Sequence, residues 1–211
     1  YTFINPYSYH LVRKKVELFG QMDGLFVDGM LMCLLCNILY GLKIHRRSFD
    51  NTTVAKDLFS YLSHSRKSVY FVGASENEIV RSITNYRKAY PQMNIIGYRN
   101  GFFKTIEERK DTIEQIKRLS PDFLVVGMGA ILQEEFLLEV KGEGFCGIGF
   151  SCGGYIRQSA EGIEYFPKWI DKFNLRAFYR LYKEKGMFRR LYNVLLEFPV
   201  LFIYDFLRLK K

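Results

Sequence analysis

The chain has 211 residues, which is enough to bury a sizeable core without disulfides or a structural metal. Its composition, 48% hydrophobic and 25% charged, excludes wholesale disorder. The 31 Lys and Arg residues outnumber the 22 Asp and Glu residues, and the net charge of +9 favours an anionic partner such as a nucleotide, a nucleic acid or an anionic lipid.

The first 65 residues predict a small α/β lobe. Thr2–Ile4 and Leu25–Val27 are strand-like, and Ser8–Phe19 and Gly29–Leu42 are helix-like. Asp28 follows the second strand and precedes Gly29. A carboxylate at that point in apolar surroundings would have a raised pKa and could act as a general base. The alternative is that Asp28 is the N-cap of the next helix.

The middle of the chain predicts a parallel sheet. Helical patterns separate strand-like runs about 25 residues apart, and the Ser75-x-x-Glu78 and Thr105-x-x-Glu108 capping boxes open two of those helices. A third helix is expected over Leu132–Val140. The predicted strands are Ser68–Val72, Asn94–Ile96, Asp122–Val126 and Gly144–Ile148.

Each of these strands leads into a glycine-bearing loop, and the loops of a parallel sheet share its carboxyl edge. Glycine lets backbone N–H groups approach a phosphate, so the loops favour a nucleotide or sugar-phosphate pocket; ordinary turns are the alternative. Gln133, after the third loop, could hydrogen-bond a base or a sugar hydroxyl, or simply belong to a polar first helical turn. Neither GxGxxG nor a P-loop is present, which disfavours a standard dinucleotide or NTP site.

Metal chemistry has no support in the sequence. Cys33 and Cys36 lie inside an apolar run, and we interpret the four cysteines as reduced thiols. The three histidines are scattered, and there is no DxD motif. We therefore expect neither a metal nor a cofactor, and we expect side-chain cations to stabilise any departing diphosphate.

The C-terminal segment carries most of the net charge. Residues 176–211 contain nine basic and three acidic residues, in two predicted helices, Trp169–Gly186 and Met187–Leu209. Arg180, Lys183 and Arg190 share one helix face. The apolar run Phe198–Tyr204 is typical of an interfacial membrane element, although a core helix with a basic end has the same pattern.

These residues also carry a resemblance to a known family. The most specific stretch runs from Pro121-Asp122 through Gly127-Met128-Gly129-Ala130 to Gln133-Glu134. Weaker matches are Asn5-Pro6, Val27-Asp28-Gly29, Arg47-Ser48-Phe49-Asp50, Val72-Gly73, Ile96-Gly97-Tyr98, Gly101-Phe102-Phe103, Gly147-Ile148-Gly149, Pro167-Lys168-Trp169 and Tyr179-Arg180-Leu181. Over nearly its whole length the chain resembles the WecG/TagA/CpsF glycosyltransferases (glycosyltransferase family 26). It departs from them at Phe3, where the family usually has Thr, and at Met187, where it has a third arginine.

The resemblance implies an inverting, metal-independent transfer of a sugar, of the N-acetylmannosamine type or a related hexose, from a UDP-sugar to an undecaprenyl-diphosphate-linked acceptor. It also implies a peripheral place on the cytoplasmic face of a bacterial membrane and a role in capsule, teichoic acid or related polysaccharide synthesis. By motif match, Asp28 is the expected catalytic base, and Arg180 and Arg190 are expected over the leaving diphosphate. The expected substrate-binding residues are Asn5, Gly29, Asp50, Gly73, Tyr98, Gly101, Gly127, Gly129, Gln133 and Lys183.

The predicted fold is α/β, with a mostly parallel Rossmann-like sheet in two lobes and a C-terminal helical appendage. The body spans residues 1–175, with lobes of about 1–65 and 66–165, and the appendage spans 176–211. The expected partners are the donor, the acceptor and an anionic membrane, without nucleic acid; homo-oligomerisation is left open. The competing hypothesis is a non-catalytic nucleotide- or nucleic-acid-binding protein, which predicts stacking aromatics on an exposed sheet.

Overall fold

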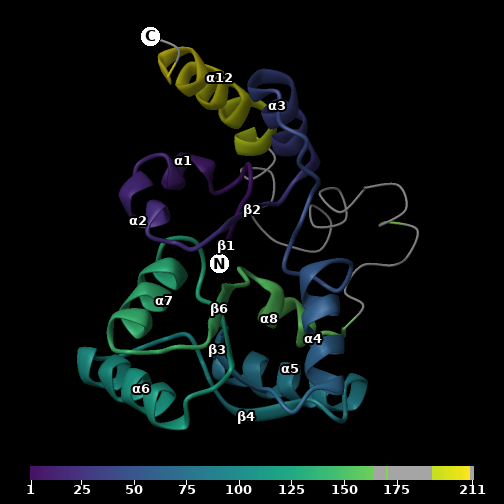
Figure 1. Ribbon diagram of the computed structural model, residues 1–211, viewed down its shortest axis with the longest axis vertical. Helices are drawn as coiled ribbons and strands as arrows, with labels where there is room; N and C mark the ends of the chain where they lie inside the picture. Colours follow the sequence, from purple (N-terminus) through teal and green to yellow (C-terminus); the bar gives the residue numbers. More distant parts are fainter. Residues whose placement is uncertain (164–169, 171–191, 210–211) are drawn as a thin grey trace.

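The computed structural model describes residues 1–163, 170 and 192–209 as an α/β protein with two parallel sheets (Figure 1). The larger sheet has the strand order β4-β3-β5-β6, and all of its neighbouring strands are parallel. Its strands are β3 (Ser68–Gly73), β4 (Asn94–Arg99), β5 (Phe123–Gly127) and β6 (Ile148–Ser151). The predicted parallel α/β fold is confirmed.

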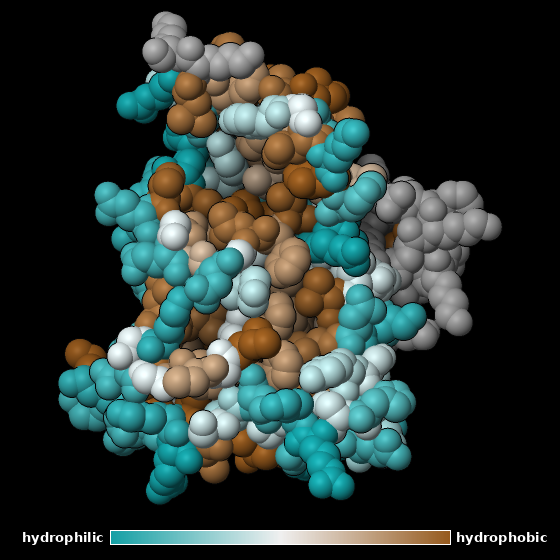
Figure 2. All heavy atoms as spheres, viewed as in Figure 1, coloured by the Kyte–Doolittle hydropathy of each residue, from teal (hydrophilic) through white to brown (hydrophobic). Residues whose placement is uncertain are grey.

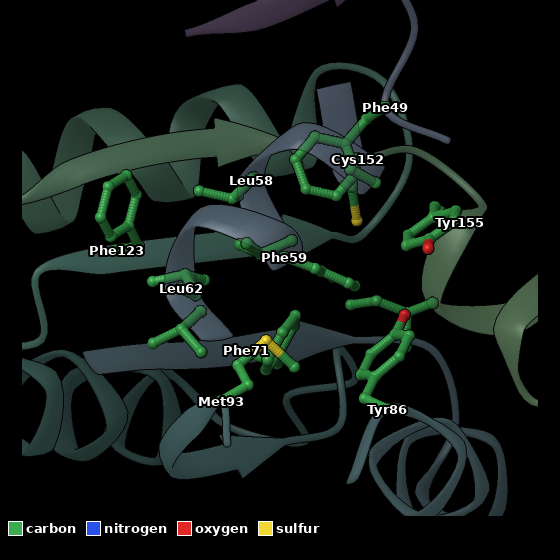
Figure 3. Packing of buried hydrophobic residues seen from close by; sticks show 14 of the residues in the cluster. Phe49, Leu58, Phe59, Leu62, Phe71, Tyr86, Met93, Phe123, Cys152 and Tyr155 are labelled. Atoms are coloured by element: carbon green, nitrogen blue, oxygen red, sulfur yellow. The ribbon is translucent and has the colours of Figure 1, made fainter. Parts of the chain in front are cut away.

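Helices cover both faces of this sheet. Alternating residues of β3 point to opposite sides: Val69 and Phe71 join one core cluster, whereas Tyr70 and Val72 join the other. The first face is covered by α4 (Val54–His64), α5 (Glu76–Ala89) and α8 (Tyr155–Ser159), and the second by α6 (Ile106–Leu119) and α7 (Leu132–Gly142). Figure 3 shows the first cluster, in which the Phe59 ring of α4 meets Phe71 and Tyr86. The central strands therefore offer no open aromatic surface to a nucleic acid.

The smaller sheet pairs β1 (Thr2–Ile4) with β2 (Leu25–Val27). Three helices follow its strands: α1 (Tyr9–Val12), α2 (Val16–Gly20) and α3 (Met30–Tyr40). Helix α12 (Phe198–Leu209), which follows the π-helical turn η1 (Asn193–Glu197), packs against α3. Its buried Phe198 and Phe202 share a core cluster with Met32 and Cys36. The end of the chain is thus part of the core of the small lobe.

The two sheets meet end to end. The backbone N–H of Ser151, the last residue of β6, donates to the carbonyl of Tyr1, and the Thr2 and Ser151 hydroxyls lie 2.7 Å apart. The small lobe therefore begins at the carboxyl edge of the large sheet, which is where parallel sheets bind ligands.

Several predicted boundaries were wrong, including the end of the strand expected at Asn94–Ile96, which extends to Arg99. The fourth strand was expected at Gly144–Ile148, but β6 begins at Ile148, whose N–H donates to Asp122 O. The preceding residues close α7, because Phe145 N–H donates back to Val140 O. The single helix expected over Ser8–Phe19 is two short helices, since Lys15 has φ −130° and ψ 37° and interrupts the helical conformation.

The sequence analysis missed α4 and α8. In α4 the buried residues Ala55, Leu58, Phe59 and Leu62 follow helical spacing, so the pattern was present in the sequence. Within the described ranges, no helix combines the length and apolar character that crossing a bilayer requires.

Candidate active site

Three motif residues meet at the carboxyl ends of β1 and β2. Asp28 directly follows β2, and its backbone N–H donates to Ile4 O at 2.8 Å. Asn5 follows β1, and its side-chain oxygen accepts a hydrogen bond from Ser8 N–H at 2.9 Å. Between β2 and α3, Gly29 has φ +109°, and a Cβ there would lie 2.8 Å from Pro6 Cδ, so only glycine fits. The N-cap of α3 is Gly29, so the alternative interpretation of Asp28 as that N-cap is wrong.

The side chain of Asp28 is held by an arginine. Arg46 Nε lies 3.0 Å from Asp28 Oδ1, and Arg46 Nη2 lies 2.9 Å from Asp50 Oδ2. The hydroxyl of Ser48 accepts from Arg46 at 2.6 Å and donates to Asp50. Asp50 also accepts two hydrogen bonds from Thr52. The predicted site residues Asp28 and Asp50 thus belong to one charged cluster with Arg46 at its centre.

Arg46 stays cationic in this cluster. Burial lowers the pKa of its guanidinium, but Asp28 and Asp50 outweigh burial, and the net result is a raised pKa. The surroundings of Asp28 are therefore ionic rather than apolar, in contrast to the expectation from the sequence. A guanidinium favours the ionised form of a carboxylate and fixes its orientation. A partly exposed, ionised and oriented carboxylate can accept a proton from a hydroxyl group.

A second group of predicted residues lies at the carboxyl edge of the large sheet. Gly73 and Gly127 are paired in register at the ends of β3 and β5, and a Cβ on Gly73 would lie 2.5 Å from Gly127 O. Gly101, after β4, donates its N–H to Ala74 O, and its own Cβ position lies 3.0 Å from Gly73 Cα. Three glycine loops therefore touch one another, as the sequence predicts, and side chains are excluded from their contact.

This edge contains the point where the strand order reverses. The chain leaves β3 toward β4 on one side, and from β4 it crosses over to β5 on the other side, so the crevice between β3 and β5 is the expected ligand position. Backbone with positive φ gathers there. Gly129 adopts φ +85° without strain, whereas Ala74 has φ +57° and Ile131 has φ +77°, which is a rare conformation for a β-branched residue. Such strain is frequent at functional sites.

Gln133 lies behind these loops and is buried. Its side-chain oxygen accepts from Gly153 N–H at 3.1 Å, and its side-chain nitrogen donates to Glu134 Oε1 at 2.8 Å. The buried Glu134 also accepts from Thr2 Oγ1 at 2.6 Å and from Ile131 N–H at 2.6 Å. This network fixes the strained loop and links β1 to α7.

The first two residues of the most specific motif, Pro121 and Asp122, lie at the opposite edge of the sheet from the glycine loops and Gln133. Asp122 precedes β5, and its carboxylate accepts hydrogen bonds from Ser68 N–H, the Ser68 hydroxyl and the Lys67 ammonium group. The hydrogen bond from Lys67 and those from Ser68 lower the pKa of Asp122 to about 2. Asp122 therefore joins the amino ends of β3 and β5 and has a structural role, far along the strands from the glycine loops.

Not every predicted residue is placed with these groups. Tyr98 lies within the edge strand β4, paired with Phe71, rather than in the loop after the strand. Arg180, Lys183 and Arg190 lie outside the described residues. Within the described part of the chain, no group of three or more His, Cys, Asp or Glu side chains is arranged to hold a metal ion.

The sequence analysis missed three functional candidates: Arg46, Glu134 and Thr2. Glu134 and Thr2 were seen only as parts of matching motifs, and pairing between residues 132 positions apart leaves no local pattern. Packing explains why this chain has Phe3 at a position where the resembled family usually has threonine. The Phe3 ring stacks on Phe26 and meets the edge of Phe49. The neighbouring Thr2 supplies a buried hydroxyl in its place.

Comparisons with known proteins identify the family of this chain. The profile of the "Glycosyl transferase WecG/TagA/CpsF family" matches residues 2–211. A UDP-Gal:alpha-D-GlcNAc-diphosphoundecaprenol beta-1,4-galactosyltransferase from Shigella boydii is 32% identical over 202 residues, which are 96% of this chain and 84% of that protein. Two N-acetylglucosaminyldiphosphoundecaprenol N-acetyl-beta-D-mannosaminyltransferases are each 25% identical. The match to the one from Bacillus subtilis (strain 168) covers 67% of this chain and 54% of that protein, and the match to the one from Bacillus spizizenii (strain ATCC 23059 / NRRL B-14472 / W23) covers 83% and 66%. The relatives are thus sugar transferases that act on diphosphoundecaprenol-linked acceptors, and this chain belongs to the WecG/TagA/CpsF family of glycosyltransferases.

Proposed function

We propose that the protein transfers a hexose from a UDP-sugar to a sugar linked to undecaprenyl diphosphate, with inversion and without a metal ion. The observation that carries the proposal is the Asp28 carboxylate at the carboxyl end of β2, oriented by Arg46. It supplies the base, and the glycine loops after β3, β4 and β5 supply a crevice for the nucleotide.

In the proposed reaction, Asp28 removes the proton from the acceptor hydroxyl as that oxygen attacks the anomeric carbon of the donor. The bond from the anomeric carbon to the diphosphate breaks, and UDP leaves with the bonding electron pair. Arg180 and Arg190, with Lys183 at helical spacing from them in the sequence, neutralise the charge that develops on UDP. Gly73, Gly101, Gly127 and Gly129 approach the phosphates; Asn5, Gly29 and Asp50 shape the acceptor side; and Tyr98 and Gln133 border the donor.

The relatives guide the choice of donor. The Shigella relative, aligned over 96% of this chain, is named for UDP-Gal and a beta-1,4 linkage, so we propose galactose as the first donor and N-acetylmannosamine as the second. A β-linked product from an α-linked UDP-sugar requires inversion at the anomeric carbon, in agreement with one general base and no covalent intermediate.

We also place the enzyme peripherally on the cytoplasmic face of the membrane, in bacterial surface polysaccharide synthesis. Support comes from the lipid-linked acceptors named for the relatives and from the net charge of +6 in residues 176–211, since bases near an anionic membrane each contribute about 1 kcal/mol of attraction.

The test is direct. Purified protein is incubated with UDP-galactose, UDP-N-acetylmannosamine and other UDP-hexoses, each with a short-chain prenyl-diphosphate N-acetylglucosamine acceptor, and products are identified by mass and linkage. A mass increase of one hexose, or of one N-acetylhexosamine with the UDP-N-acetylmannosamine donor, with a β linkage supports the proposal. Formation of no product from any donor, with UDP binding retained, would favour the non-catalytic nucleotide-binding hypothesis.

A further inference from the structure

We propose that the outer surface of α3, together with that of α12, docks on anionic lipid and brings the Asp28 site to the membrane. This inference rests on the proposed function. It adds a membrane contact outside the basic C-terminal segment, on a helix that begins two residues after the candidate base.

The first observation is the composition of α3. Its 11 residues, Met30–Tyr40, contain no charged side chain. A helix that is apolar all round is normally buried in a core or in a membrane. In α3 the inner face is buried at Met32, Cys33 and Cys36, but the outer face is not covered by the described residues.

The second observation is the regular exposure of the outer face. Met30, Leu34 and Ile38 are 58%, 53% and 66% exposed, and their spacing of four residues places them in one stripe along the helix. At 1.5 Å per residue the helix is about 16 Å long, which is too short to cross a bilayer and suits a helix lying in the interface.

The third observation is that α12 continues the apolar surface. While Phe198, Phe202 and Phe206 are buried, Val200 and Leu207 on the opposite side are 67% and 56% exposed. Figure 1 shows α3 and α12 together at one end of the long axis, and Figure 2 shows brown side chains gathered over them, whereas the opposite end is mostly teal. Apolar exposure on this scale marks an interaction site.

Charge identifies lipid as the occupant. Exposed bases lie on the helix pair and on the segments next to it: Lys43 follows α3, Arg208 lies in the last turn of α12, and Lys14 and Lys15 follow α1, which contacts α12. The acid on α12, Asp205, is neutralised by Arg13 through two hydrogen bonds of 2.8 and 2.6 Å. An apolar stripe bordered by bases matches the interface of an anionic bilayer. An acceptor whose prenyl chain stays in that bilayer would then present its sugar near the start of α3, beside Asp28.

The test compares the double variant Leu34→Glu/Ile38→Glu with the control Val80→Glu/Ile106→Glu. The control residues are exposed apolar side chains on α5 and α6, at the other end of the molecule. Co-sedimentation with phosphatidylglycerol vesicles is measured for each protein, with phosphatidylcholine vesicles as the neutral comparison. We expect the α3 variant to lose affinity for the anionic vesicles by on the order of a hundredfold, because each glutamate removes an apolar contact and meets a negative surface. The control should bind as the unmodified protein does.

Turnover of a water-soluble acceptor separates this inference from the proposed function. The α3 variant should retain that turnover while losing vesicle binding; absence of turnover in the unmodified protein would refute only the proposed function. Unchanged vesicle binding by the α3 variant would overturn the inference. So would a dimer of the unmodified protein that the α3 variant abolishes without loss of vesicle binding, since a second copy would then cover the stripe.

A second measurement requires no substitution. Hydrogen exchange of the unmodified protein is followed with and without phosphatidylglycerol vesicles. Slower exchange over residues 30–40 and 198–209 is the expected result, and exchange unchanged at residues 30–40 would refute the contact through α3.

Discussion

At the scale of single residues, the candidate base has an environment that its own segment did not reveal. Local sequence placed Asp28 after a strand, and that was correct. Its partner Arg46 comes from the connection between α3 and α4, and Asp50, later in the same connection, anchors Arg46. Two arginines, Arg46 and Arg47, are adjacent in the sequence. The sequence does not indicate which of them pairs with Asp28, 18 residues before Arg46. The position of Asp28 could thus be predicted, but the orientation of its carboxylate could not.

The first prediction concerns Asp28→Asn. We expect turnover to fall by on the order of 10²-fold or more, because an amide cannot take the proton from the acceptor and general-base contributions have that size. UDP binding and thermal stability should change little. Steady-state kinetics measure turnover, a UDP titration measures UDP binding, and a thermal melt measures stability. Asp111→Asn on the exposed surface of α6 is the control. Near-normal turnover would remove Asp28 from the mechanism.

The second prediction concerns Arg46. Replacement by Met leaves two carboxylates near each other without their shared cation, so we expect turnover to fall by about tenfold or more while the KM for the donor changes little. Arg46→Lys should recover part of the loss, because an ammonium group restores charge but not the two-armed contact. Arg87→Met on α5 is the control. A loss that appears only in the donor KM would show that Arg46 binds the donor instead.

At the scale of elements, strongly patterned segments were predictable and connections were not. The Ser75 and Thr105 caps mark the starts of α5 and α6, where Glu78 and Glu108 close the hydrogen bonds. The strand after α7 was misplaced because the Gly-rich segment before Ile148 has β-like composition yet folds back onto Val140 O. The position of β6 depends on pairing with β5, which is a long-range interaction that a local window does not contain.

The third prediction concerns Asp122, which joins the amino ends of β3 and β5. Its folded-state pKa of about 2 lies below the ordinary 3.8, so its contribution to stability is fully present above pH 3.8 and disappears as the pH falls through about 2. We expect Asp122→Asn to unfold at lower urea concentration than the unmodified protein at neutral pH, and the difference to narrow below pH 3.8. Asp23→Asn, an exposed acid paired with Lys141, is the comparison. A difference that is constant down to pH 2 would mean that packing, not charge, stabilises the strand ends.

At the scale of the whole molecule, α12, the described helix of the predicted appendage, packs on the small lobe. The sequence analysis assigned residues 176–211 to an appendage because this segment is more basic and richer in aromatic residues than the chain before it. In the structure α12 completes the small lobe, with Phe198 and Phe202 against α3 and Tyr9 and Arg13 bonded to Asp205. An apolar run has the same pattern whether protein or lipid covers it, and α12 has one face buried against protein and one exposed apolar face.

The fourth prediction is that activity survives chelation. No DxD motif occurs in the sequence, and arginine side chains are proposed to stabilise the departing UDP. Initial rates with excess EDTA should therefore equal those with added Mg²⁺ or Mn²⁺. If EDTA abolishes activity and only added Mg²⁺ or Mn²⁺ restores it, a metal ion and not the arginines stabilises the departing UDP.

The last prediction separates the two functions of the C-terminal segment. Removing everything from Arg176 onward would also remove α12, exposing Met32 and Cys36 and leaving Arg13 without Asp205. A truncated protein that loses activity would therefore reveal nothing about the arginines, because large losses of buried aromatic contact destabilise a lobe by several kcal/mol.

The double substitution Arg180→Ala/Arg190→Ala avoids this problem. It keeps α12 in place, so we expect unchanged thermal stability. Binding to anionic vesicles should be weakened by at most about 30-fold, because two bases at about 1 kcal/mol each are lost. Turnover should fall by on the order of 10³-fold, since each charge-assisted contact with a diphosphate contributes about 1.5–3 kcal/mol. Arg208→Ala on α12 is the matched control, because it removes a base from the same segment without touching the proposed diphosphate site. If the double variant turns over a soluble acceptor at the full rate, the segment acts only in membrane attachment, and the stabilisation of UDP has to come from the glycine loops and helix N-termini of the large sheet.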